Sequence, residues 1–80
     1  MNNVVRSKVN DFKWCIIDEN NQYVHKDSIK KVNRNEYTYT YYSRMERSYP
    51  NKEMANIALS ILNLHNVVGK LGHDFKIIKV

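Results

Sequence analysis

The chain has 80 residues, a formal net charge of +5 and an isoelectric point near 9.4. A chain of this length forms one domain, residues 1–80, and leaves no room for the second lobe of a large enzyme cleft. Hydrophobic residues make up 42% of the sequence, which contains two glycines and one proline, so a linker or low-complexity chain is excluded. No stretch approaches the ~18 apolar residues that cross a bilayer. We therefore expect a cytoplasmic protein with no membrane partner.

The excess of positive charge favours acidic partners, because a basic surface attracts polyanions and acidic proteins over long range. The single cysteine, Cys15, lies in an apolar run and is expected to be a small buried residue. The three histidines, His25, His65 and His73, lack the close spacing of metal ligands. We predict neither a metal site nor a cofactor.

The first third of the chain predicts a hairpin. Residues 1–10 fit either a flexible tail or a short edge strand. Residues 12–17, Phe-Lys-Trp-Cys-Ile-Ile, are rich in aromatic and β-branched side chains and predict a buried strand. Residues 18–22 supply the Asp and Asn of a turn, and residues 23–25 resume the strand. Residues 26–35 hold few apolar anchors among their cations and predict either one helical turn or a basic loop.

The most regular pattern is the alternation of tyrosine and threonine within residues 36–45, which predicts a strand antiparallel to that hairpin. Successive side chains of a strand point to opposite faces. One face carries Tyr37, Tyr39 and Tyr41, and the other carries Thr38, Thr40 and Tyr42. If the tyrosine face is exposed, we expect it to be the binding surface. If it is buried under Met54, Ile57 and Ile61, we expect binding to move to Arg44, Arg47 and the basic segment from Lys26 to Arg34.

A helix is predicted to begin at Lys52, because Asn51 is suited to cap it and Glu53 complements its dipole. Apolar side chains then recur every three or four residues, so one face should pack on the sheet. That face consists of Met54, Ile57, Ala58, Ile61, Leu62, His65 and Val68, and the other side of Lys52, Asn56, Ser60, Asn63 and Asn66. Gly69 or Gly72 should end the helix in the left-handed conformation.

Residues 75–80 close the chain with a last predicted strand. These elements together predict an α+β fold of two layers in the order β-β-β-α-β. In this fold a mainly antiparallel sheet of three or four strands is covered on one face by the principal helix. Its other face stays open.

The sequence combines a Trp-containing hairpin, a Pro-Asn-Lys-Glu-Met-Ala helix start at residues 50–55 and a final Lys-Ile-Ile-Lys-Val segment. This layout resembles that of short accessory proteins of phages and mobile elements in low-GC Gram-positive bacteria. This resemblance implies a non-enzymatic binder or inhibitor of host machinery in the bacterial cytoplasm, with anti-CRISPR proteins as its most concrete form. It carries no catalytic residues over to this chain.

The candidate binding set combines aromatic and basic residues from the middle of the chain. It consists of Tyr37, Tyr39, Tyr41, Tyr42, Arg34, Arg44, Arg47, Lys30 and Lys31. Tyrosine and arginine dominate the hot spots of protein interfaces, which favours a bacterial protein or nucleoprotein as the partner. Aromatic faces also stack unpaired bases while cations hold phosphates, so a sequence-tolerant binder of single-stranded DNA or RNA is the alternative. A third interpretation places one tyrosine row in the core.

We predict no enzymatic activity, because the sequence contains no glycine-rich phosphate loop and no nucleophile signature. A small basic ribonuclease is the weaker alternative, with His25 and either Arg34 or Tyr39 as the acid–base pair. A homodimer also remains open, because a Tyr/Thr strand without proline or glycine could pair with a second copy at the sheet border.

Overall fold

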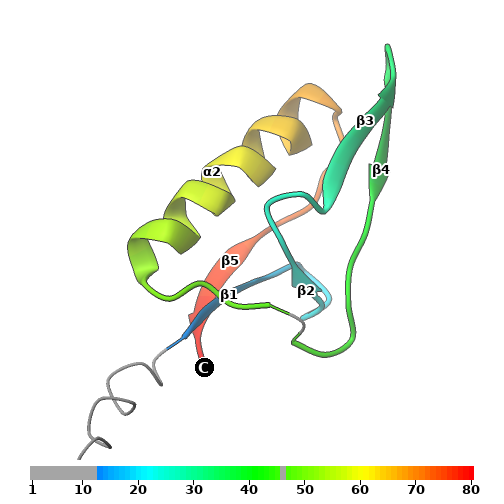
Figure 1. Cartoon of the computed structure of the whole chain (residues 1–80). Coiled ribbons are helices and arrows are strands. Elements are labelled where there is room, and N and C mark those ends of the chain that lie inside the picture. Colours follow the sequence, from blue (N-terminus) through cyan, green and yellow to red (C-terminus); the bar gives the residue numbers. More distant parts are fainter. Residues whose placement is uncertain (1–12, 46) are drawn as a thin grey trace, which may run out of the picture.

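The computed structural model describes residues 13–45 and 47–80 (Figure 1). The elements in chain order are β1 (Trp14–Ile17), β2 (Tyr23–Val24), β3 (Ile29–Asn33), β4 (Glu36–Tyr39), α2 (Lys52–Val68) and β5 (Lys76–Lys79). The α+β fold class is confirmed, since the helix packs against antiparallel strands. The expected tail or edge strand at residues 1–10 lies outside the described residues.

The described strands form two sheets. β1 is the central strand of the first, with the order β2-β1-β5, where Ile16 lies opposite Val24 on one side and Ile77 on the other. β3 and β4 form a separate two-stranded antiparallel sheet, which Figure 1 shows extending beside the end of α2. The order is therefore β-β-β-β-α-β, one strand more than predicted.

The additional strand corrects the expectation of a helical turn or loop within residues 26–35. Ile29 is buried and lies opposite Tyr39, and the cations that follow it pair with the tyrosine strand. The β-branched Ile29 suits a pleated strand better than a single helical turn. Residues 34 and 35 then form the turn between the two strands.

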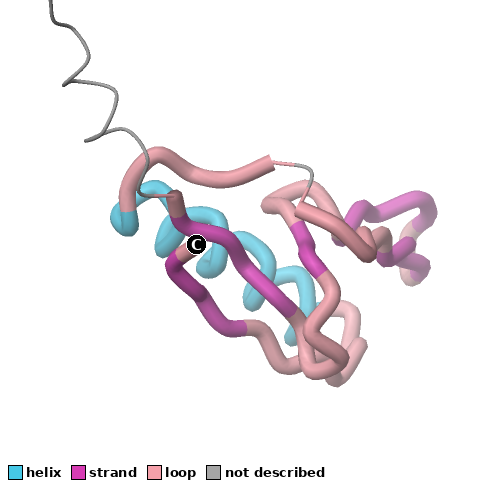
Figure 2. The backbone as a smooth tube through the Cα atoms, turned by 90° about the horizontal axis from the view of Figure 1, so that it is seen from below, coloured by secondary structure: helices cyan, strands magenta, loops and turns pink. Residues whose placement is uncertain are grey.

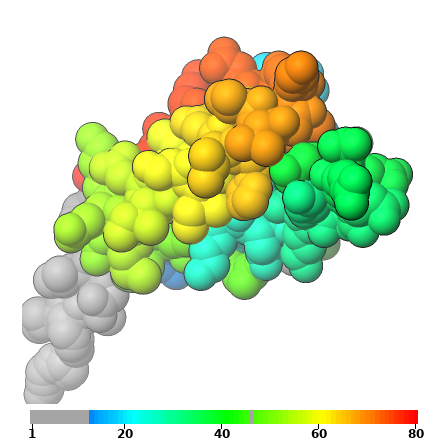
Figure 3. Space-filling model, turned by 90° about the horizontal axis from the view of Figure 1, so that it is seen from above, coloured from blue at the N-terminus to red at the C-terminus, as the bar shows by residue number. Residues whose placement is uncertain are grey.

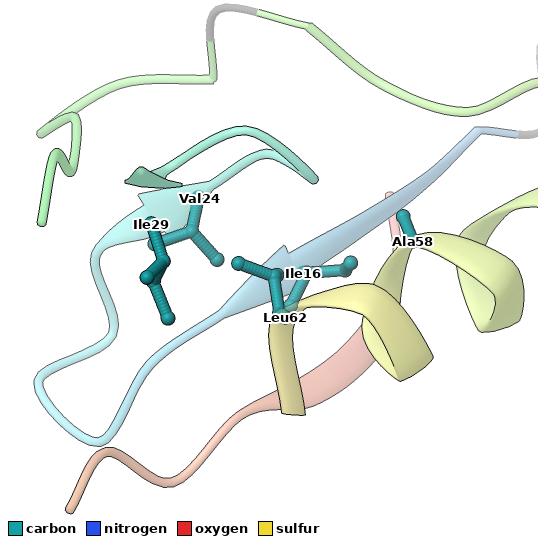
Figure 4. Close-up of a cluster of buried hydrophobic side chains, with 5 residues drawn as sticks. All are labelled: Ile16, Val24, Ile29, Ala58 and Leu62. Atoms are coloured by element: carbon teal, nitrogen blue, oxygen red, sulfur yellow. The ribbon is translucent and has the colours of Figure 1, made fainter. Parts of the chain in front are cut away.

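The core lies between α2 and the first sheet, and Figure 2 shows the helix lying along these strands. Figure 4 shows the cluster of buried side chains that joins these elements: Ile16, Val24, Ile29, Ala58 and Leu62. Ile16 and Leu62 have no exposed surface. Because Ile29 belongs to the same cluster, the second sheet is anchored to the first through the core.

The start of α2 is as predicted. The side chain of Asn51 accepts a hydrogen bond from the N–H of Met54 at 2.9 Å, and Glu53 lies in the first turn. Such a cap satisfies one of the backbone donors that a helix start leaves unpaired.

The face that α2 turns to the core differs from the predicted one. The buried residues of the helix are Ala55, Ala58 and Leu62, and of these only Ala58 and Leu62 belong to the predicted face. Met54, Ile57 and Val68 were assigned to that face by their spacing, yet they are largely exposed. Relative to the predicted orientation, the helix is rotated about its axis, because the two small alanines permit close approach to the strands.

Asn66 is also placed differently from the prediction, which put it on the solvent side. It is half-buried and exchanges two hydrogen bonds with the backbone of His73, at 2.6 and 3.0 Å.

The face of β1 that points away from α2 is covered, which corrects the expectation of an open face. Cys15 and Ile17 are only 2% and 6% exposed. The carbonyl oxygen of Arg47 lies 3.9 Å from Cys15 Sγ, so the segment that leads into α2 crosses this side. Cys15 is buried as predicted, and burial raises the pKa of its thiol. Within the described residues no helix is long and apolar enough to span a membrane.

Candidate functional site

The predicted Tyr/Thr strand is shorter than its pattern suggests, since β4 ends at Tyr39. Beyond it the chain leaves β3 and joins the edge of the first sheet, where Tyr42 and Tyr23 exchange two backbone hydrogen bonds of 2.9 Å. The prediction that this strand pairs with the first hairpin along its length is therefore wrong, because the two are joined only at this bridge. Its pairing partner is β3.

The register of the β3–β4 hairpin divides the predicted binding set between two faces. Lys31 lies opposite Tyr37, whereas Lys30 lies opposite Thr38. Residues directly opposite each other in an antiparallel pair point to the same face. Tyr37 and Tyr39 are half-buried and pack against the core, so Lys31 shares the inner face with them. Lys30 and Thr38 lie on the outer, exposed face.

The side chain of Tyr39 is held in place by contacts within the fold. Its ring stacks on His73 with 3.8 Å between the centroids, and its hydroxyl donates to Asp18 Oδ2 at 2.6 Å. Burial, followed by the hydrogen bond to Asp18, raises the pKa of Tyr39. The phenol therefore keeps its proton and serves as a donor that ties β4 to the turn after β1.

Two of the three tyrosines on the predicted face are thus turned inward. The ring of Tyr37 lies 6.2 Å from that of His65, and Tyr39 contacts His73 and Phe75. These partners are at the end of α2 and after it, not Met54, Ile57 and Ile61 as the alternative interpretation proposed. Tyr41 remains 54% exposed.

Tyr42 and His25 form a second aromatic contact. Their ring centroids lie 5.0 Å apart, Tyr42 is half-buried and His25 is only 3% exposed. His25, with either Arg34 or Tyr39, was the acid–base pair considered for a small ribonuclease. The structure places it in the interior, where its side chain offers little surface to a polymer substrate.

The predicted arginines do not gather at one place. Arg44 and Arg47 lie in the segment that runs from β4 back toward α2, away from the tip of the β3–β4 hairpin (Figure 1). Both are exposed, and Arg47 Nη2 lies 3.5 Å from Asp27 Oδ1. An exposed pair of this kind contributes little stability. Arg34 is at the tip of the hairpin, close in sequence to Lys30 and Lys31.

A basic groove lies between the hairpin tip and the end of α2. Its volume is about 320 Å³, and its lining residues are Lys31, Arg34, Asn35, Tyr37, Val68, Gly69 and Lys70. Three of these carry a positive charge, and the lining, as far as the structure describes the chain, includes no carboxylate. The nearest acid of the hairpin, Glu36, accepts a hydrogen bond from Asn33 Nδ2 at 2.6 Å.

Lys70 is the groove residue that the sequence analysis missed. It follows the helix directly, with φ of 52°, and its N–H and that of Leu71 donate to the carbonyls of Val67 and Asn66. This is the Schellman arrangement, with lysine where glycine is usual. Neither predicted glycine is therefore the left-handed cap, because Gly69 has a φ of −84° and Gly72, whose φ is 77°, lies two residues beyond Lys70. The position of Lys70 directly after a glycine at the predicted helix end was the sequence signal that could have identified it.

Gly69 is required for a different reason, namely the close approach of Tyr37. A Cβ atom at position 69 would lie 2.9 Å from Cδ1 of Tyr37 and 3.1 Å from the backbone oxygen of His65. The absence of a side chain thus allows the hairpin to lie against the helix end. This contact closes the inner wall of the basic groove.

A second hollow, of about 270 Å³, is acidic and is lined by Asp18, Glu19, Asn21, Asp74, Phe75 and Lys76. Two of its carboxylates already have structural partners. Asp18 accepts the N–H groups of Asn20 and Gln22 at 2.9 Å, besides the Tyr39 hydroxyl. Glu19 accepts the N–H of Asp74 at 3.0 Å and lies 3.0 Å from His73 Nδ1, and these bonds lower its pKa to about 2.

These carboxylates therefore hold the turn after β1 against the segment before β5. No group of three or more potential metal ligands was found among residues 13–45 and 47–80. In the basic groove, by contrast, the three lining cations, Lys31, Arg34 and Lys70, are all exposed to solvent.

Comparisons with protein-family models, with curated proteins and with solved structures give no match to this chain.

Proposed function

We propose that this chain is a non-enzymatic binding protein that attaches to an acidic surface of a bacterial protein or nucleoprotein complex and inhibits it. The observation that carries the proposal is the basic groove together with the exposed hairpin tip beside it. Lys31, Arg34 and Lys70 converge there, and Lys30 extends the positive charge to the outer face. Complementary charge of this kind steers association and selects acidic partners.

The burial of the tyrosines favours a protein or nucleoprotein over nucleic acid alone. Binders of single strands use several exposed rings as stacking platforms. Here Tyr37 and Tyr39 pack against the core, and Tyr41 is the exposed member of the row. The available surface consists chiefly of cations, which pair equally well with clustered Asp and Glu side chains.

The layout resemblance supplies the inhibitory part of the proposal. Short accessory proteins of phages and mobile elements commonly act by occupying a surface of host machinery. An anti-CRISPR role, in which the basic hairpin occupies an acidic region of an RNA-guided nuclease complex, is the most concrete form of this proposal.

Binding to single-stranded nucleic acid is the second candidate, and the groove itself favours it, because three convergent cations can neutralise phosphates. This candidate makes a quantitative prediction. Displacement of counterions by three contacts gives a slope of about −2 in the logarithm of the association constant against the logarithm of the salt concentration.

Affinity capture from bacterial lysate, with and without nuclease, tests the proposal. The test variant reverses the charge of the hairpin by Lys30→Glu, Lys31→Glu and Arg34→Glu. The control reverses three exposed lysines elsewhere, Lys13→Glu, Lys26→Glu and Lys76→Glu, and has the same net charge. We expect a nuclease-resistant partner that the wild type and the control retain and that the hairpin variant loses at least tenfold.

Three outcomes would contradict parts of this proposal. Equal capture by the hairpin variant would remove the site, and no specific capture by the wild type would remove the binding function. Loss of the partner after nuclease treatment would favour nucleic acid. Fluorescence anisotropy with labelled single-stranded DNA and RNA at 50 and 200 mM salt then measures the slope, and shortening of the labelled RNA would revive the ribonuclease alternative.

A further inference from the structure

The three cations of the basic groove come from three different segments and meet at one hollow. Lys31 belongs to β3, Arg34 lies in the turn at the hairpin tip, and Lys70 follows α2. In Figure 3 the hairpin, in green, lies against the orange end of the helix. Among residues 13–45 and 47–80, no salt bridge involves any of these three cations.

The backbone holds these cations at the groove. Lys31 lies directly opposite Tyr37 in the register of the hairpin, and this register places it on the inner face. Lys70 is fixed by its left-handed conformation, with φ of 52°. Three like charges around a hollow of about 320 Å³ repel one another, and a bound anion would remove that repulsion. The groove is therefore preorganised for an anion that carries more than one negative charge.

The end of α2 does not oppose such an anion. The last carbonyl groups of a helix carry partial negative charge, which normally repels anions. Here the N–H groups of Gly69, Lys70 and Leu71 donate to three of these carbonyls, at 2.8, 3.1 and 3.0 Å. Lys70 also places a full positive charge beside them. An anion in the groove would therefore meet the cations rather than unpaired carbonyl oxygens.

The rest of the groove lining is uncharged and suits a flat ring. Tyr37 supplies an aromatic surface, and Val68, which is 58% exposed, supplies an aliphatic one. Asn35 adds an exposed amide that can both donate and accept hydrogen bonds. Aromatic side chains stack on nucleic-acid bases, and polar side chains hydrogen-bond to their edges. The carboxylates of a protein partner would use the cations and leave this uncharged wall without a function.

We infer that the basic groove binds a free nucleoside diphosphate, with the phosphates at Lys31, Arg34 and Lys70 and the base against Tyr37 and Val68. Its volume of about 320 Å³ is at the lower end of the ~300–1,000 Å³ range of small-ligand sites, so it takes one nucleotide rather than a length of strand. A terminal phosphate carries a charge of about −1.5 to −2, so a second phosphate is needed to match three cations. This binding does not depend on the protein partner proposed above, although both would use the groove.

Isothermal titration calorimetry of the full chain with adenosine diphosphate, adenosine monophosphate, pyrophosphate and adenosine tests this inference. We expect a dissociation constant on the order of 100 µM for the diphosphate, because an open groove covers only part of the ligand. The monophosphate and pyrophosphate should bind at least about threefold more weakly, since one lacks a phosphate and the other lacks the ring. Adenosine should give no measurable binding.

Two variants locate the phosphates. Lys31→Gln should weaken the binding of adenosine diphosphate at least about tenfold, because a charge-assisted contact is lost. The matched control is Lys30→Gln, which removes the same charge from the outer face of β3 and should keep the affinity within about twofold. Lys70→Gly should also weaken binding, and glycine adopts φ of 52° without strain, so unfolding would not account for the loss.

Three results would overturn the inference. The first is the absence of both heat and a shift of the Val68 and Gly69 amide resonances with the diphosphate at about tenfold the expected dissociation constant. The second is equal affinity of the Lys31 and Lys30 variants. The third is equal affinity for pyrophosphate and adenosine diphosphate, which would leave a simple anion site. Capture of a protein partner without nucleotide binding would contradict this inference alone, whereas nucleotide binding without a captured partner would support it and contradict only the proposed function.

Discussion

Two adjacent residues at the end of α2 divide the tasks that one glycine often performs. Lys70 adopts the left-handed conformation that reverses the chain, and Gly69 allows the Tyr37 ring to approach. A residue with a Cβ adopts the left-handed conformation at a cost of roughly 1 kcal/mol. In this costly conformation Lys70 supplies one of the three cations of the basic groove.

Substitutions at these two positions should therefore have opposite effects on stability. Lys70→Gly should raise the free energy of unfolding by about 0.5–1 kcal/mol, because glycine adopts φ of 52° without strain. Gly69→Ala should lower it by about 1–3 kcal/mol, since the new methyl group would press against the Tyr37 ring and the His65 carbonyl. Urea denaturation followed by circular dichroism measures both. Equal effects of the two variants would contradict this division of tasks.

At the scale of elements, the β3–β4 hairpin is held by a few specific side chains. Two short strands are marginally stable alone in water, so the hairpin depends on the rest of the molecule. Ile29 enters the core, Tyr37 packs on Gly69, and Tyr39 bonds Asp18. These contacts fix the direction in which the hairpin presents its cations.

Removal of the Tyr39 hydroxyl tests this anchoring. Tyr39→Phe should lower the free energy of unfolding by about 1.5–3 kcal/mol, because a hydrogen bond to a charged, buried carboxylate is lost. The matched control is Tyr41→Phe, whose side chain is 54% exposed, and its effect should stay within about 0.5 kcal/mol. Thermal unfolding of both variants measures the difference. Equal stability of the two variants would show that the Asp18 bond does not hold the hairpin.

The elements were predictable where a single local signal determines them. The Asn51 cap, the strand around Ile16 and the last strand all carry such signals, and they were found. The period of two also predicted that Tyr37 and Tyr39 share a face. It could not say which face is buried, because that depends on where the end of α2 lies.

The rotation of α2 was not predictable for a related reason. Apolar residues occupy two neighbouring rows of the helix, one through Ala58 and Leu62 and the other through the exposed Met54, Ile57 and Leu64. Periodicity alone joins both rows into one wide face. Only the packing of the small alanines on β1 decides which row is buried, so the prediction merged a core row with an exposed one.

At the scale of the whole molecule, two hollows of opposite charge are separated. The basic groove lies between the hairpin and the helix end, and the acidic hollow lies between the turn after β1 and the segment before β5. In the acidic hollow the carboxylates of Asp18 and Glu19 are acceptors of structural hydrogen bonds. Its contribution should therefore appear in the stability of the fold rather than in binding.

Acid titration of the fold tests that role of Glu19. Its pKa is lowered from an ordinary 4.5 to about 2, first by the N–H of Asp74 and then by His73. A carboxylate with a depressed pKa in the folded state contributes stability that is complete above about 4.5 and is lost as the pH falls toward 2. The melting temperature of wild type should therefore exceed that of Glu19→Gln at pH 7, and the gap should close between pH 4.5 and pH 2. The control is Glu53→Gln, which alters an exposed carboxylate in the first turn of α2. A gap between wild type and Glu19→Gln that stays constant from pH 4.5 to pH 2 would show that the ionised carboxylate does not hold these segments together.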